Sequence, residues 1–149
     1  MVMGRFRSIL AVVLACVTVF LVSCSSATEV KPPTYTSAKL ELIGKYTSSI
    51  EAMRDRLPEL AKLIQDENWV FTKNFIRGPL GELRAKMSQV ERNLLPNDQP
   101  KAKEVGQQVI EDLIGIDAGA EAQDYKATIR SYAALKKDID AFLGLTPKA

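Results

Sequence analysis

Apolar residues recur every three or four positions along most of this chain, which is the period of an α-helix with one buried face. The first stripe follows Thr36 or Ser37, either of which can cap a helix start. It consists of Leu40, Ile43, Thr47, Ile50, Met53 and Leu57. A proline inside a helix costs about 3 kcal/mol and disfavours helical angles at the residue before it. Pro58 therefore predicts a kink or short break, with a further helical segment through Leu60, Ala61 and Ile64.

A second stripe begins after Asp66 or Asn68, which are both good capping residues. Its apolar positions alternate at four and three, and they are Ile76, Leu80, Leu83, Met87, Val90 and Leu94. Gly78 and Pro79 lie inside this stripe. They predict a local bend near the beginning of a second helix.

Leu95-Pro96-Asn97-Asp98 ends that helix and starts a third, with Asp98 as its cap and Pro100 in its first turn. The third stripe is Ala102, Val105, Val109, Leu113 and Ile116. Residues 119–124 are predicted to form a turn. The last stripe is Tyr125, Ile129, Tyr132, Leu135, Ile139 and Phe142, ending near Gly144. Because no segment reads as a strand, residues 36–149 predict an all-α, antiparallel up-down-up-down four-helix bundle.

The first 23 residues have a different pattern, which is typical of a secretory signal peptide. Arg5 and Arg7 precede an apolar run that is too short and too asymmetrically flanked for a good spanning helix. The run ends in Leu21-Val22-Ser23-Cys24, which resembles the lipobox of bacterial lipoproteins. Residues 1–23 are therefore predicted to be a lipoprotein signal peptide, with Cys24 lipidated on its sulfur and left as the first residue of the mature chain. An ordinary signal peptide and an uncleaved anchor are the alternatives.

The stretch after the signal peptide is polar and contains two consecutive prolines, Pro32 and Pro33. Such a composition favours extended polyproline II structure over a packed element. Residues 24–35 are accordingly predicted to be a lipidated N terminus and flexible tether. The lipid on Cys24 would hold the helical domain at a membrane surface without spanning it.

Removal of the signal peptide changes the charge of the chain. The full sequence has 20 basic and 18 acidic residues, and the signal peptide carries two of the basic residues, Arg5 and Arg7, and none of the acidic ones. The mature chain is therefore neutral, which takes away the main support for nucleic-acid binding. The neutral balance directs attention to protein partners and to the membrane reached through the lipid anchor.

Composition also argues against catalysis. The chain has no histidine, Cys16 leaves with the signal peptide, and Cys24 is the predicted lipidation site. The commonest acid–base side chain and the commonest transition-metal ligands are thus missing. Neither a Gly-rich phosphate loop nor a nucleophile elbow is present, and the carboxylates lie at helical spacing beside Lys and Arg. We therefore predict no catalytic residue, metal, cofactor or small-molecule substrate.

The second helix carries the distinctive sequence of this chain. Its segments are Asp66-Glu67-Asn68-Trp69-Val70, then Phe75-Ile76-Arg77-Gly78-Pro79-Leu80-Gly81-Glu82-Leu83-Arg84, and later Leu94-Leu95-Pro96. In this combination the chain resembles the PsbQ family of photosystem II extrinsic proteins, in its cyanobacterial form, over essentially the whole mature sequence. The resemblance implies a four-helix bundle on the lumenal face of photosystem II, anchored by lipid to the thylakoid membrane.

The resemblance also implies a non-catalytic role. Such a subunit stabilises the oxygen-evolving complex, helps it to retain calcium and chloride, and supports the assembly of active centres. Its partners are the photosystem II core and the other extrinsic subunits. The candidate partner-binding residues are Trp69, Arg77, Gly78, Pro79 and Arg84.

Each candidate also has a structural interpretation. Trp69 is more often a core residue than a docking anchor. Gly78 and Pro79 either re-aim a helix or expose backbone to a partner. Arg77 and Arg84 lie seven positions apart and share a face of a continuous helix, and arginine is favoured at interfaces.

Two other functions compete with the photosystem II interpretation. The anchor and the helices, taken without the motif, are equally typical of a generic bacterial envelope lipoprotein, such as a periplasmic helical chaperone or stress sensor. A carboxylate di-metal bundle enzyme would need Glu-x-x-His pairs, which the chain lacks.

Overall fold

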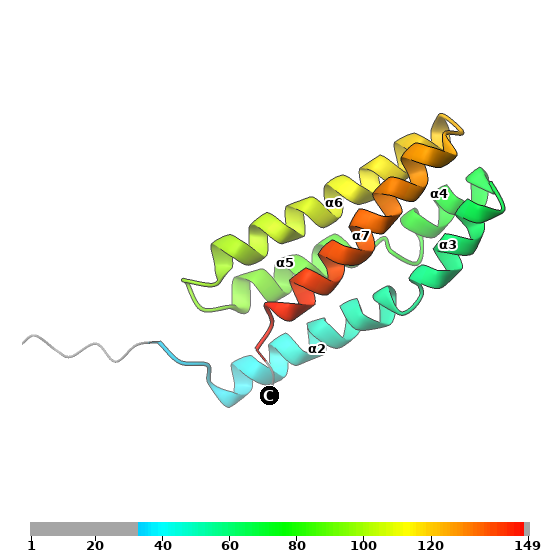
Figure 1. Ribbon diagram of the computed structural model, residues 1–149. Coiled ribbons are helices and arrows are strands. Elements are labelled where there is room, and N and C mark those ends of the chain that lie inside the picture. The colour runs from blue at the N-terminus through cyan, green and yellow to red at the C-terminus, as the bar shows by residue number, and fades with distance from the viewer. Residues whose placement is uncertain (1–32, 148–149) are drawn as a thin grey trace, which may run out of the picture. The chain divides into compact units, whose positions relative to one another are not determined.

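Residues 33–147 are described by a computed structural model, and all their regular elements are α-helices, without a strand. The helices are α2 (Ser37–Arg54), α3 (Leu57–Gln65), α4 (Trp69–Arg77), α5 (Leu83–Asn93), α6 (Gln99–Glu121) and α7 (Tyr125–Gly144) (Figure 1). The predicted all-α class is therefore confirmed. The signal peptide, Cys24 and most of the 24–35 tether lie outside the described residues and stay predictions. No helix in the described part has the length and apolar character needed to cross a bilayer.

The first apolar stripe is divided into α2 and α3, as Pro58 predicted. Thr36 caps α2, because its Oγ1 accepts a hydrogen bond from the Lys39 N–H at 3.3 Å. The break falls at residues 55–56, just before the predicted position. Pro58 lies in the first turn of α3, where a proline loses no helical hydrogen bond.

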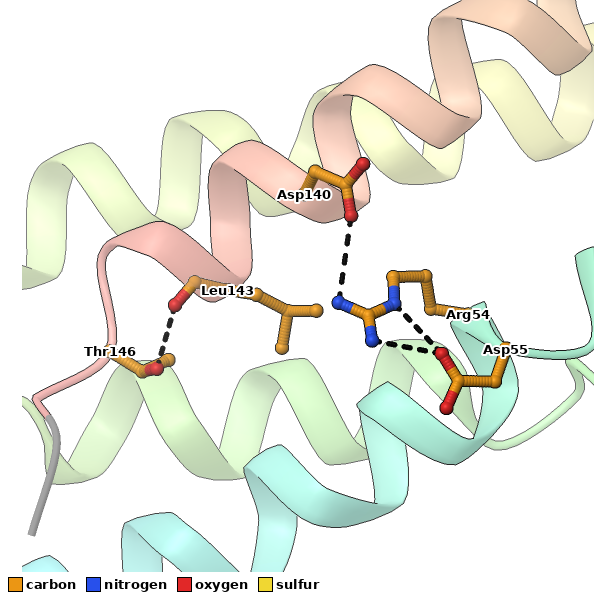
Figure 2. Close-up of polar contacts among 5 residues, drawn as sticks. All are labelled: Arg54, Asp55, Asp140, Leu143 and Thr146. Carbon is orange, nitrogen blue, oxygen red and sulfur yellow. Dashed lines mark hydrogen bonds and ion pairs between the residues drawn. The ribbon is translucent and has the colours of Figure 1, made fainter.

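Arg54 connects the end of α2 to α7 (Figure 2). Its guanidinium lies 2.8 Å from the Asp55 carboxylate and 3.7 Å from that of Asp140 in α7. The Tyr132 hydroxyl of α7 reaches the same region and donates to the Leu57 carbonyl at 3.2 Å. The chain thus changes direction between α2 and α3 while both ends of the break remain attached to α7.

The α3–α4 and α6–α7 connections share one backbone geometry. Glu67 and Gln123 have φ angles of 52° and 54°, in the left-handed region. In the first connection the N–H groups of Glu67 and Asn68 donate to Ile64 and Leu63 at 3.0 and 2.9 Å. In the second, those of Gln123 and Asp124 donate to Ala120 and Gly119 at 3.3 and 2.9 Å. Both connections are therefore Schellman motifs.

The residue after each left-handed position caps the next helix. Asn68 accepts a hydrogen bond from the Phe71 N–H at 3.4 Å, and Asp124 accepts one from Ala127 at 3.0 Å. Of the two caps predicted for the second helix, Asn68 is thus the one used. Each of these two connections therefore consists of only three residues, 66–68 and 122–124.

Two details of the third helix were predicted wrongly. Residues 119–121 belong to α6 and not to a turn, because Gly119 is buried against Thr128 at the start of α7. Asp98 occupies the predicted N-cap position of α6, but its side chain makes no capping hydrogen bond. Its carboxylate instead accepts a hydrogen bond from the Tyr35 hydroxyl at 3.0 Å, and that hydroxyl accepts one from the Leu95 N–H at 3.1 Å.

The helices pack with α6 along α7 and α2 along α5, while α4 contacts α6 and α3 contacts α7 (Figure 1). Nearly all predicted apolar positions lie between them. The largest fully buried side chains are Phe142, Ile43, Ile50, Leu57, Leu60, Ile64, Leu80, Leu83, Met87, Leu94, Ile116 and Leu135. These side chains form one hydrophobic core.

Candidate partner-binding site

The predicted bend at Gly78 and Pro79 is a full interruption of the second helix. α4 ends at Arg77 and α5 begins at Leu83. Local hydrogen bonds close the turn between them, from the Gly78 N–H to Asn74 at 2.8 Å, from Gly81 to Gly78 at 3.0 Å and from Leu83 to Leu80 at 3.0 Å. Leu80 is 2% exposed and fixes the turn to the core.

Gly81 is required by the close approach of the backbone. A Cβ at this position would lie 2.4 Å from the Arg77 carbonyl oxygen, nearer than any real contact. A side chain would therefore force the turn apart. The motif acts first as a device that re-aims the chain between α4 and α5, which is the structural interpretation of Gly78 and Pro79.

Ion pairs attach α4 to α6 beside this turn. The Arg77 guanidinium lies 3.0 and 3.2 Å from the two carboxylate oxygens of Asp117. One turn earlier, Lys73 pairs with Glu121 and lowers the pKa of that carboxyl by hydrogen bonding and charge. Exposed ion pairs are screened by water and add little to stability, so these two orient α4 more than they stabilise it.

Arg77 and Arg84 line one groove between the turn, α5 and α6, with a volume of about 300 Å³. We call it the Arg84 groove. Its apolar surface is formed by Ile76, Leu80, Ile110, Leu113 and Ile114. Its remaining lining is Arg77, Gly81, Arg84 and Asp117. Arg77 lies at the end of α4 and Arg84 in α5. The turn between the two helices therefore brings the arginines together, whereas the prediction assumed that both lie on one continuous helix.

The groove continues along α5 and α6 into a second hollow of about 490 Å³. Arg84, Ile110 and Ile114 border both hollows. At the far end Glu91 lies over Gly106, which has no side chain to displace it. Burial raises the pKa of the Glu91 carboxyl, and the nearby charges of Lys103 and Arg92 oppose that shift.

The other candidates lie outside the groove. Trp69 is the first residue of α4 and is half-buried, so it is neither a full core residue nor a fully exposed anchor. Val70 and Phe71, its neighbours, are 64% and 59% exposed. Gly78 is exposed and Pro79 half-buried, and neither lines the Arg84 groove.

Sequence reasoning missed the α6 side of the groove. Ile110 and Ile114 lie four residues apart, next to the buried stripe of Val109, Leu113 and Ile116. The sequence did hold a signal for this surface, because the two isoleucines widen the apolar stripe of α6 on one side. For metals, no group of three or more potential ligands comes together within residues 33–147.

Comparison with known proteins shows the family of this chain. The chain matches the PsbQ family, described as oxygen evolving enhancer protein 3, over residues 4–147. The chain belongs to the PsbQ family. It is also 40% identical over 148 residues to CyanoQ from Synechocystis sp., covering 99% of both chains. PsbQ proteins are non-catalytic extrinsic subunits of photosystem II.

Proposed function

We propose that this PsbQ protein is a lipid-anchored subunit on the lumenal face of photosystem II in the thylakoid membrane. It binds the core and the other extrinsic subunits, stabilises the oxygen-evolving complex and slows its loss of calcium and chloride. It also supports the assembly of active centres. The observation that carries this proposal is the 40% identity to CyanoQ over 99% of both chains, signal region included.

The proposed architecture is an antiparallel up-down-up-down four-helix bundle. α2 with α3 forms the first member, α4 with α5 the second, and α6 and α7 the third and fourth. Support comes from the packing of α6 along α7 and of α2 along α5. A body of this kind, without a catalytic group of its own, acts by covering a partner surface and limiting the exchange of ions with solvent.

Deletion of the gene tests the function. The expected result is that deletion thylakoids lose oxygen evolution faster than wild type when calcium or chloride is depleted, and that the wild-type gene restores the rate. Oxygen evolution and centre stability equal to wild type under both depletions would contradict the proposal. Recovery of the protein in plasma or outer membrane, with none in thylakoids, would favour an envelope lipoprotein.

A Cys24→Ala variant behind a signal peptide that is cleaved without lipidation tests the anchor. Because two acyl chains give stable attachment and an unlipidated chain has only its protein contacts, a salt wash of the thylakoids should release the variant and leave wild type bound. Mass spectrometry of the wild-type N terminus checks the lipid directly. An unmodified Cys24 in the mature chain would rule out the lipoprotein assignment.

A further inference from the structure

A large apolar side chain, that of Ile114, lies mostly exposed where the Arg84 groove meets the second hollow. Ile114 is 60% exposed, whereas Leu113 beside it in α6 is 8% exposed. A single exposed isoleucine is common, but this one borders both hollows and adjoins the half-buried Ile76 and Ile110. Together they offer a continuous apolar surface to a partner.

The charge at this apolar surface is uneven. Arg77 is paired with Asp117, and Lys73 with Glu121. Arg84 is exposed and makes no ion pair within residues 33–147. The lining of the Arg84 groove therefore carries one uncompensated positive charge, on a guanidinium whose planar donors suit a carboxylate.

The dimensions of the groove suit a peptide segment. Between Ile110 and Asp117, the outermost α6 residues that line the Arg84 groove, the helix rises roughly 10 Å at ~1.5 Å per residue. An extended segment of about three residues or a helix of about two turns spans that length. A free carboxylic acid or an inorganic ion would fill only a small part of it.

We propose that the Arg84 groove binds an acidic, apolar peptide segment of a photosystem II subunit. An apolar side chain of the segment packs on Ile110 and Ile114, and an adjacent Asp or Glu carboxylate pairs with Arg84. Charge complementarity selects this occupant, because a basic segment would meet the unpaired guanidinium. The proposal rests on the proposed function and adds to it the surface and the chemistry of the partner.

Binding of full-length variants to photosystem II particles from the deletion strain tests the role of Arg84. Arg84→Glu is expected to raise Kd by roughly tenfold or more, and added salt should weaken wild type while having little effect on the variant. Arg84→Lys should lie between them, because it keeps the charge but not the two-pronged contact. Arg130→Glu, at an exposed arginine of α7 without an ion pair in residues 33–147, is the matched control and should bind like wild type.

Two results of this binding experiment would overturn the proposal in distinguishable ways. If wild type binds and Arg84→Glu binds equally well, the Arg84 groove is not the binding site and the proposed function stands. If wild type itself does not bind, both the groove proposal and the proposed function are contradicted. Thermal unfolding of each variant confirms folding, since Arg84 and Arg130 are exposed.

Photo-crosslinking identifies the occupant. Benzoylphenylalanine is placed at Ile114 in the full-length chain in thylakoids, and at Ala133, an exposed position of α7, as the control. The expected product from position 114 is a peptide of a photosystem II subunit with an apolar residue next to an Asp or Glu. A basic peptide, a second copy of this chain, or lipid alone as the crosslinked product would overturn the proposal.

Discussion

Thr72 of α4 and Thr128 of α7 occupy equivalent positions in two copies of one helix connection. Both are fully buried, and they are the buried polar side chains of the described core. Thr72 donates to the Asn68 carbonyl at 2.9 Å, and Thr128 donates to that of Asp124 at 2.7 Å. Each hydroxyl is thereby satisfied by the capping residue four positions earlier, so burial of the threonine costs little.

Because the two connections are equivalent, glycine substitutions at Glu67 and Gln123 should change the stability of the fold by similar amounts. A left-handed conformation costs a residue with a Cβ about 1–2 kcal/mol, and glycine avoids part of that cost. Glu67→Gly and Gln123→Gly should each raise the free energy of unfolding by up to ~1 kcal/mol in chemical denaturation. Lys62→Gly, inside α3, is the control and should lower it by about 1 kcal/mol. A loss of stability at both left-handed positions would contradict the interpretation.

Gly119 should not tolerate alanine. A Cβ there would lie 2.5 Å from Thr128 Oγ1 and 3.0 Å from the Thr128 backbone nitrogen. Because backbone must move to make room, Gly119→Ala should lower the free energy of unfolding by about 1–3 kcal/mol. At Gly44 in α2 nothing lies within 4 Å of the added Cβ, so Gly44→Ala should raise stability by about 0.5–1 kcal/mol. Thermal and urea unfolding of the pair measure the contrast.

Gly119 also shows what a sequence pattern leaves undetermined. The apolar stripes predicted the helical segments and most of the core, because burial of an apolar face is the main reason for helix formation in a small domain. They did not predict that α4 and α5 are separate helices, and residues 119–124 were predicted to form a turn. The helix continues through Gly119 because α7 begins against it, and such a tertiary contact has no trace in local propensity.

The candidate site was also predicted only in part from the sequence. Arg77 and Arg84 were predicted to act together, and they do line one groove. The reason given for it was wrong, since the Gly78–Gly81 turn separates the two helices that carry them. The α6 wall with Ile114 was not predicted, because pairing of distant helices depends on the three-dimensional packing and not on spacing within one helix.

Asp112 should make the folded state less stable as pH rises. Burial, followed by the charge of Asp138 on α7, raises the pKa of the Asp112 carboxyl from 3.8 to about 6. Glu111 adds to the shift and Lys137 opposes it. The folded chain therefore keeps a proton that the unfolded chain releases. Its stabilising contribution is complete below about pH 4 and is lost as the pH rises through about 6.

Asp112→Asn removes this dependence. At pH 7 the variant should be more stable than wild type by about 1 kcal/mol, a figure reduced to allow for the partial exposure of the carboxyl. The difference should vanish at pH 4. Subtraction of the two unfolding curves cancels the opposite pH dependence of Glu59 and Glu121, whose pKa values are lowered by Arg56 and Lys73.

Tyr35 should stabilise the connection between α5 and α6. Its hydroxyl accepts from the Leu95 N–H and donates to Asp98, and burial is the main cause that raises its pKa. Tyr35→Phe removes both hydrogen bonds and should cost about 1 kcal/mol. Tyr125→Phe, at a 40% exposed tyrosine, is the matched change and should be nearly neutral. Faster amide exchange at Leu95 in Tyr35→Phe alone would identify the lost contact.

Alanine substitutions at Gly81 and Gly106 should affect stability differently, because the added Cβ meets a different obstacle at each site. In both, a new Cβ would lie 2.4 Å from an oxygen. At Gly81 that oxygen is the Arg77 carbonyl, which is part of the turn and cannot withdraw. At Gly106 it is Oε1 of Glu91, the end of a flexible side chain beside open space.

Gly81→Ala should therefore lower the free energy of unfolding by about 1–3 kcal/mol. Gly106→Ala should be neutral or stabilising by up to ~1 kcal/mol, since alanine is the better helix former and Glu91 can rotate away. A Gly81→Ala variant as stable as wild type would show that the Arg77 carbonyl is free to move. In that case the Gly78–Gly81 turn would not be the rigid element that places Arg77 and Arg84 on one groove, and the two arginines would need a partner to hold them there.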